Sequence, residues 1–157
     1  MAGTPGNLWR NAQTAANGDN GDKRIDSPGV LPYHSAVMET SDTLHVYFER
    51  ALLRTPAALP LNTAWSRDED GCVAVFRVRF RSGRVNEVDY RATTCATLLG
   101  LCEHLSELLP GMTESEVLSF SAGNLLSLHP EIPPGRRVRA ELAVRALHAG
   151  CLSARRN

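Results

Sequence analysis

What this sequence lacks excludes several classes of protein. Its 157 residues contain no apolar run of the roughly 18 residues that a membrane helix needs, so we expect no membrane span. Lys and Arg together number 17, as do Asp and Glu, which leaves no positive excess to neutralise the phosphates of a nucleic acid. The patterns GxSxG, HExxH, GxGxxG and the Walker loop are also absent. We therefore expect no membrane or nucleic-acid partner and no enzyme of these classes.

The cysteines also lack a common arrangement, because no two of them form a CxxC pair, which excludes a local zinc knuckle. The N-terminus shows no basic segment followed by an apolar stretch, so we expect no secretory signal and a cytoplasmic location. In such a compartment, thiols or metal ligands are expected rather than a disulfide framework. The chain has four cysteines: Cys72, Cys95, Cys102 and Cys151.

Composition divides the chain into a tail and one folded domain. Residues 1–28 are rich in alanine, asparagine, glycine and aspartate and offer little to bury, so we expect a disordered tail. Residues 29–43 are expected to form a linker, and the folded domain is expected over residues 44–154. Apolar residues at helical spacing begin the domain, with Ser41 or Asp42 as the expected cap of that helix.

A hairpin follows the first helix. Residues 72–80 alternate between apolar side chains and arginines, which is typical of a half-buried strand. Ser82-Gly83 supplies a tight turn, and residues 84–91 continue as a second strand. Because acidic residues lie among the arginines, we expect a solvated sheet face rather than a binding stripe.

Helices are expected after the hairpin. Leucines and Cys102 make one apolar stripe over residues 95–109, Thr113 and Glu116 form a capping-box pattern, and a last helix is expected over residues 136–154. This order predicts an α+β fold, a small antiparallel sheet of two or three strands with helices packed on one face. We expect Cys102 in the core and Cys151 as an incidental thiol near a frayed end.

The histidines are weaker candidates for a site. We expect His104 at the boundary of the apolar stripe and His129 on a loop. His148 lies three residues before Cys151, so both would share one helix face, where a surface metal site is conceivable but unspecific.

The hairpin register brings two thiols close together. Counting outward from the turn places Cys72 opposite Thr93, with Cys95 two residues further at the same open end. Cys95 also begins a helix, whose N-terminus favours a thiolate. Asp68 and Asp70 precede Cys72 and add oxygen atoms that could bind a metal.

A family pattern emerges from these elements taken in order. A strand–turn–strand unit leads into residues 88–105, Val-Asp-Tyr-Arg-Ala-Thr-Thr-Cys-Ala-Thr-Leu-Leu-Gly-Leu-Cys-Glu-His-Leu. Gly111-Met112-Thr113-Glu114-Ser115-Glu116 follows, and Pro133-Pro134 precedes a helix that contains Leu142-Ala143-Val144-Arg145-Ala146-Leu147. Over about residues 44–150 the chain resembles the IscU/NifU N-terminal family, the scaffold proteins of iron–sulfur cluster assembly.

The resemblance implies a site built from three cysteines, an aspartate and often a histidine. Cys95 falls on the middle cysteine, and the family's Cys-Gly-Asp reads Asp70-Gly71-Cys72 here. Val138 and Arg139 stand at the third cysteine site, and neither can bind iron, although an arginine would favour nearby thiolates. Asp70, Cys72 and Cys95 are thus the expected ligands of iron or a [2Fe–2S] cluster, with zinc as a variant.

Three functions remain open at this stage. The first is a scaffold or carrier that binds iron or a [2Fe–2S] cluster transiently, with four thiolates supplied by Cys72 and Cys95 of two chains in a homodimer. The resemblance implies a cysteine desulfurase and recipient apo-proteins as partners, with Cys95 as the sulfur acceptor. The alternative, which Arg139 favours, is a module without a cluster that acts by protein–protein interaction or regulation. The third, a thiol enzyme, lacks a visible His–Asp pair for Cys95.

Overall fold

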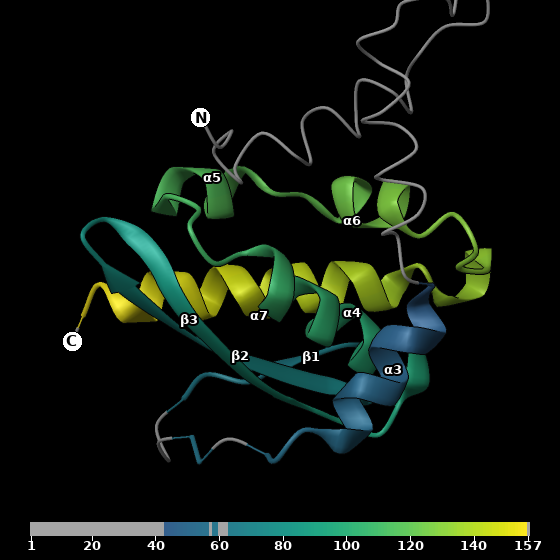
Figure 1. The fold of residues 1–157 in the computed structure, drawn as a ribbon. Helices are drawn as coiled ribbons and strands as arrows, with labels where there is room; N and C mark the ends of the chain where they lie inside the picture. The colour runs from purple at the N-terminus through teal and green to yellow at the C-terminus, as the bar shows by residue number, and fades with distance from the viewer. Residues whose placement is uncertain (1–42, 57, 60–62, 157) are drawn as a thin grey trace, which may run out of the picture.

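The computed structural model describes residues 43–56, 58–59 and 63–156 (Figure 1). The expected tail, the linker up to residue 42 and the expected caps Ser41 and Asp42 lie outside the described residues. No helix in the described part of the chain is long and apolar enough to cross a membrane. The elements follow in the order α3 (Leu44–Leu53), β1 (Ser66–Arg67), β2 (Val73–Arg81), β3 (Arg84–Ala92), α4 (Ala96–Leu108), α5 (Glu114–Ser119), α6 (Ala122–Leu128), η2 (Pro134–Arg136) and α7 (Val138–Ala154).

The three strands form one antiparallel sheet in the order β1-β2-β3. Ser82 and Gly83 both have positive φ, 52° and 74°, which is the geometry of a two-residue hairpin turn that matches the twist of its strands. On the arginine face, Arg77 lies opposite Asp89 and Arg79 opposite Glu87, and each pair forms a salt bridge. The predicted hairpin and its solvated, charged face are therefore confirmed.

The register of the hairpin differs from the prediction by one residue. Phe80 pairs with Val85 but Arg79 pairs with Glu87, so Asn86 is an extra residue in β3. Such a β-bulge shifts every pair beyond it, and the predicted pairing of Cys72 with Thr93 is wrong. Thr93 instead bonds to Val73: its N–H donates to the Val73 carbonyl at 3.0 Å, and its hydroxyl accepts from the Val73 N–H at 3.1 Å.

The helices cover one face of the sheet, as predicted (Figure 1). α7 packs on β2, α4 packs on β3, and α3 packs on α4. A Cβ atom on Gly150 would lie 2.4 Å from the Phe76 carbonyl oxygen, so glycine lets α7 approach the backbone of β2 closely. The largest fully buried core side chains include Phe76, Leu98, Leu101, Leu105, Phe120, Leu142 and Leu147. The α+β class is confirmed.

Several local expectations need correction. Cys102 is fully buried, as predicted, but Cys151 is fully buried too, so it is a core thiol and not one at a frayed end. The last helix begins at Val138, because the preceding residues turn in η2. A further helix, α6, was not predicted; it begins with a capping box in which Ser121 and Asn124 bond reciprocally.

Candidate thiol and arginine site

The loop between β1 and β2 fixes the position of Cys72. Asp68 accepts the Cys72 N–H through its Oδ1 at 2.9 Å, and its own N–H donates to the Cys72 carbonyl at 3.0 Å. The Gly71 N–H donates to the Asp68 carbonyl, and Gly71 has a φ of 81°, which a residue with a Cβ rarely adopts. These bonds close a tight loop over residues 68–72 that presents Asp70 and Cys72 at the start of β2.

Cys95 lies at the N-terminus of α4. Its carbonyl accepts the Leu99 N–H at 2.8 Å, and its side chain makes no capping hydrogen bond. Its N–H donates to the carbonyl of Thr93, whose own backbone bonds to Val73, the residue after Cys72. Cys72 and Cys95 are both partly buried free thiols. The structure thus places both at the open end of the hairpin.

Arg139, in the first turn of α7, lies at the centre of this site. Its side chain is 5% exposed and forms salt bridges with Asp68 and Asp70, the second at 2.7 Å between Nη2 and Oδ2. Asp68 is itself 3% exposed, whereas Asp70 is 64% exposed. The guanidinium therefore ties the β1–β2 loop to the start of α7.

The electrostatics of the site keep Arg139 charged. Burial lowers the pKa of its guanidinium, but the bonds to Asp70 and the Cys95 thiol, with the charges of Cys72 and Asp68, outweigh burial and raise that pKa. The Arg139 Nε is buried and has no hydrogen-bond partner. One permanent cation thus forms salt bridges with two carboxylates, and the two thiols contribute to the rise in its pKa.

The ligands that the sequence predicts do not form a complete metal site in one chain. Asp70 is paired with Arg139, and no group of three or more His, Cys, Asp or Glu side chains in the described ranges could hold a metal ion. The iron or cluster that the resemblance implies therefore does not fit this arrangement of side chains. Arg139 contributes to the site by its charge and not as a ligand.

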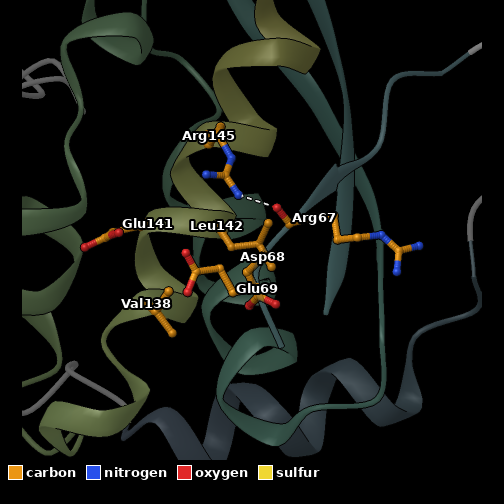
Figure 2. Close-up of a pocket in the computed structure, with 7 residues that line it drawn as sticks. All are labelled: Arg67, Asp68, Glu69, Val138, Glu141, Leu142 and Arg145. Carbon is orange, nitrogen blue, oxygen red and sulfur yellow. Dashed lines mark hydrogen bonds between the residues drawn. The ribbon is translucent and has the colours of Figure 1, made fainter. Parts of the chain in front are cut away.

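A cavity of about 380 Å³ lies beside this site (Figure 2). One wall is made by residues 67–69, and the other by Val138, Glu141, Leu142 and Arg145 of α7. An Arg145 Nη2–H donates to the Arg67 carbonyl at 2.6 Å across one end. The cavity thus lies between the same loop and the same helix that Arg139 joins.

His104 is partly buried in α4 and His129 follows α6 outside any helix, as expected, but His148 is placed differently. His148 bonds through Nε2 to the carbonyls of Val117 and Phe120, and Cys151 is buried, so the surface metal site suggested for them is wrong. His104 and His129 meet instead, with 2.6 Å between Nδ1 and Nε2. No local signal could show this, because the two residues are 25 positions apart.

The two histidines help to hold α3. The Tyr47 ring stacks on the His104 ring at 4.2 Å between centroids. His129 bonds through Nδ1 to Glu131 at 3.1 Å, and Glu131 accepts the Leu44 N–H at 2.9 Å. The N-terminus of α3 is therefore capped by a distant carboxylate, because Thr43 makes no side-chain cap.

Comparison with known proteins gives a likeness in fold. No protein-family model matches the chain, and no curated protein matches it. Among solved structures, the chain is similar to the solution structure of a hypothetical protein from Thermus thermophilus, at 17% identity and a TM-score of 0.53. The match covers 96% of this chain and 98% of that one. At this identity the likeness shows a shared fold alone.

Proposed function

We propose that this protein is a divergent relative of the IscU/NifU scaffolds that takes part in iron–sulfur cluster assembly by binding partner proteins, and that a single chain holds no cluster. Arg139 is the observation that supports this function most directly. It stands where the resemblance implies a third cysteine ligand, and it pairs with Asp70, an expected ligand. We place this activity in the cytoplasm.

Ligand chemistry supports the absence of a cluster from one chain. A [2Fe–2S] cluster needs four protein ligands, and Cys72 and Cys95 supply two thiolates. A metal that recruited Asp70 would have to break the Asp70–Arg139 salt bridge and leave a buried guanidinium beside it. The same cation suits a thiolate or persulfide anion, which carries negative charge and needs no open coordination position.

The resemblance suggests a cysteine desulfurase as one partner and recipient apo-proteins as others. Cys95 is the proposed sulfur acceptor, because it is partly exposed and interacts with Arg139. In the transfer, the Cys95 thiolate attacks the outer sulfur of the desulfurase persulfide. A persulfide then forms on Cys95, and the desulfurase cysteine leaves as a thiolate, so no oxidant is needed.

Calorimetric titration of the full chain into the cysteine desulfurase of the same genome tests this proposal. We expect saturable binding, and we expect Cys95→Ser to keep that binding while losing the persulfide label detected by mass spectrometry. Cys102→Ser is the matched control, since Cys102 is fully buried and its thiol should not be labelled. No binding by the wild-type chain would contradict the proposal.

A second candidate function is favoured by the partial exposure of both Cys72 and Cys95. Two chains that meet at this end of the hairpin would supply four thiolates to a shared [2Fe–2S] cluster, without the use of Asp70. This carrier function predicts a homodimer with half a cluster per chain. Zinc could bind to the same thiols in place of the cluster. A homodimer that takes up no iron would contradict this carrier function.

A further inference from the structure

We propose that the turn of the β2–β3 hairpin is a docking surface for an acidic segment of a partner protein, and that Arg81 and Arg84 bind the carboxylates of that segment. This inference goes beyond the proposed function, because the turn lies at the end of the sheet away from the thiols. β2 runs for nine residues between Cys72 and the turn, which separates the two by roughly 30 Å. Figure 1 shows the turn at the end of the sheet away from α3.

The first observation is the distribution of charge on the face of the sheet opposite the helices. Further from the turn, arginines of β2 form cross-strand salt bridges with acidic residues of β3: Arg77 with Asp89 and Arg79 with Glu87. The pair next to the turn breaks this pattern, because Arg81 lies opposite Arg84. Among the described residues, no acidic side chain forms a salt bridge with either of these two arginines. Two positive charges therefore remain at the turn.

The second observation is that this arginine pair does not serve the fold. Like charges directly opposite each other in a sheet are destabilising. Charged side chains also protect an exposed sheet edge from pairing with another strand, but the edge of β3 is already closed at this point. The Val85 N–H donates to the Met112 carbonyl at 2.8 Å, and the Gly111 N–H donates to the Val85 carbonyl at 2.7 Å. Neither strand pairing nor edge protection accounts for two arginines at the turn.

The third observation is that both guanidinium groups are accessible and one of them is held in place. Arg81 and Arg84 are exposed residues, and they flank the two-residue turn with their Cα atoms about 5.5 Å apart. The Arg84 Nη1–H donates to the Gly111 carbonyl at 2.8 Å, which uses one of the five N–H donors of the guanidinium. Two guanidinium groups at this spacing suit carboxylates, which arginine binds through two parallel hydrogen bonds.

The neighbouring charges favour an acidic protein segment over a nucleic acid as the occupant. A nucleic acid binds through many phosphate contacts, and the turn offers two arginines in a chain of zero net charge. Glu87 lies in the next cross-strand pair and would repel a polyanion that continued along the hairpin. A short acidic segment can reach the turn without passing over that carboxylate.

Fluorescence anisotropy of a labelled oligoglutamate peptide, titrated with the full chain, tests the inference. The turn variant carries Arg81→Gln and Arg84→Gln together, which removes both charges at the turn. The matched control carries Arg91→Gln and Arg156→Gln, which removes two exposed arginines elsewhere and leaves the same net charge. Circular dichroism verifies that the wild-type chain and both double variants are folded.

We expect the wild-type chain to bind oligoglutamate saturably, and more weakly at high ionic strength because salt screens exposed charges. The turn variant should bind the peptide roughly tenfold more weakly or worse, because it loses two sets of charge-assisted hydrogen bonds. The control variant should bind less than about threefold more weakly, because its lost charges act only from a distance.

Three results would overturn the inference. The first is a wild-type chain that shows no saturable binding of oligoglutamate. The second is an equal loss of affinity in both double variants, which would make net charge responsible instead of the turn. The third is tighter binding of a single-stranded oligodeoxynucleotide than of oligoglutamate, lost in the turn variant, which would assign the surface to nucleic acid. The proposed function fails on a different result, the absence of desulfurase binding by the wild-type chain, so the two failures can be told apart.

Discussion

Acidification from about pH 7.5 to about pH 4.5 should destabilise this protein through the contact between His104 and His129. Burial, helped by neighbouring His129, lowers the pKa of His104 to about 3, although the charge of Glu131 acts in the other direction. Burial also lowers the pKa of His129, although its bond to Glu131 acts in the other direction. In the unfolded chain both imidazoles take up a proton near pH 6.5, so the unfolded state gains stability below that pH.

The size of the effect follows from the difference in pKa. Each pH unit below the unfolded pKa costs about 1.36 kcal/mol for a histidine that stays neutral in the folded protein. At about pH 4.5, two units below, His104 alone should lower the free energy of unfolding by roughly 2.7 kcal/mol. Burial raises the pKa of Glu131, but bonds from Leu44 and His129 outweigh it and lower that pKa below its ordinary value.

Urea unfolding followed by circular dichroism at several pH values measures this loss. We compare the wild-type chain with His104→Gln, which removes one titrating group and keeps a polar side chain under Tyr47. Between about pH 7.5 and about pH 4.5, the free energy of unfolding of the variant should fall by about 2.7 kcal/mol less than that of the wild type. His45→Gln is the control for loss of an imidazole on the exposed surface, since that side chain is 72% exposed.

Equal pH dependence in the wild type and His104→Gln would refute the reasoning. It would mean that His104 is protonated as readily in the folded protein as in the unfolded chain. The contact with His129 would then not hold a neutral pair.

The remaining predictions concern packing and thiol reactivity. Gly150→Ala should lower the free energy of unfolding by about 1–3 kcal/mol, because its Cβ would lie 2.4 Å from the Phe76 carbonyl oxygen. Gly135→Ala, with no atom within 4 Å of the new Cβ, should change it little in the same urea titration. Alkylation of the native chain should modify the two partly buried thiols and spare the two fully buried ones, in part because burial raises the pKa of Cys151 to about 11. Early modification of Cys151, located by peptide mass spectrometry, would contradict its burial.

Local chemistry made most of the fold predictable. The hairpin turn, the apolar stripe of α4 and the capping box at Thr113 depend on neighbours within a few residues, and all three are present. The shift in register at Asn86 could not be predicted, because counting residue pairs outward from the turn assumes a regular ladder without a β-bulge. The place of Cys72 was therefore right in outline and wrong by one residue in its pairing.

The position of the candidate site at the end of the hairpin could be predicted from the sequence, but the salt bridges within it could not. Asp70 and Cys72 lie at the start of β2 and Cys95 just before α4, so all three belong to one end of the hairpin, because strand order and the start of α4 determine that end. The salt bridges of Arg139 join residues about 70 positions apart, and only the packing of α7 on β2 brings them together. The meeting of His104 and His129 could not be predicted for the same reason.

Anaerobic reconstitution of the wild-type chain with ferrous iron, sulfide and thiol tests most directly whether Arg139 keeps a single chain free of a cluster. Visible absorbance, iron and sulfide are measured beside Cys72→Ser, Cys95→Ser and the buried control Cys102→Ser. We predict that the folded wild-type chain retains no more iron or sulfide than the two site variants. A cluster in the wild type as a monomer, lost in Cys72→Ser and Cys95→Ser but kept in Cys102→Ser, would contradict that claim.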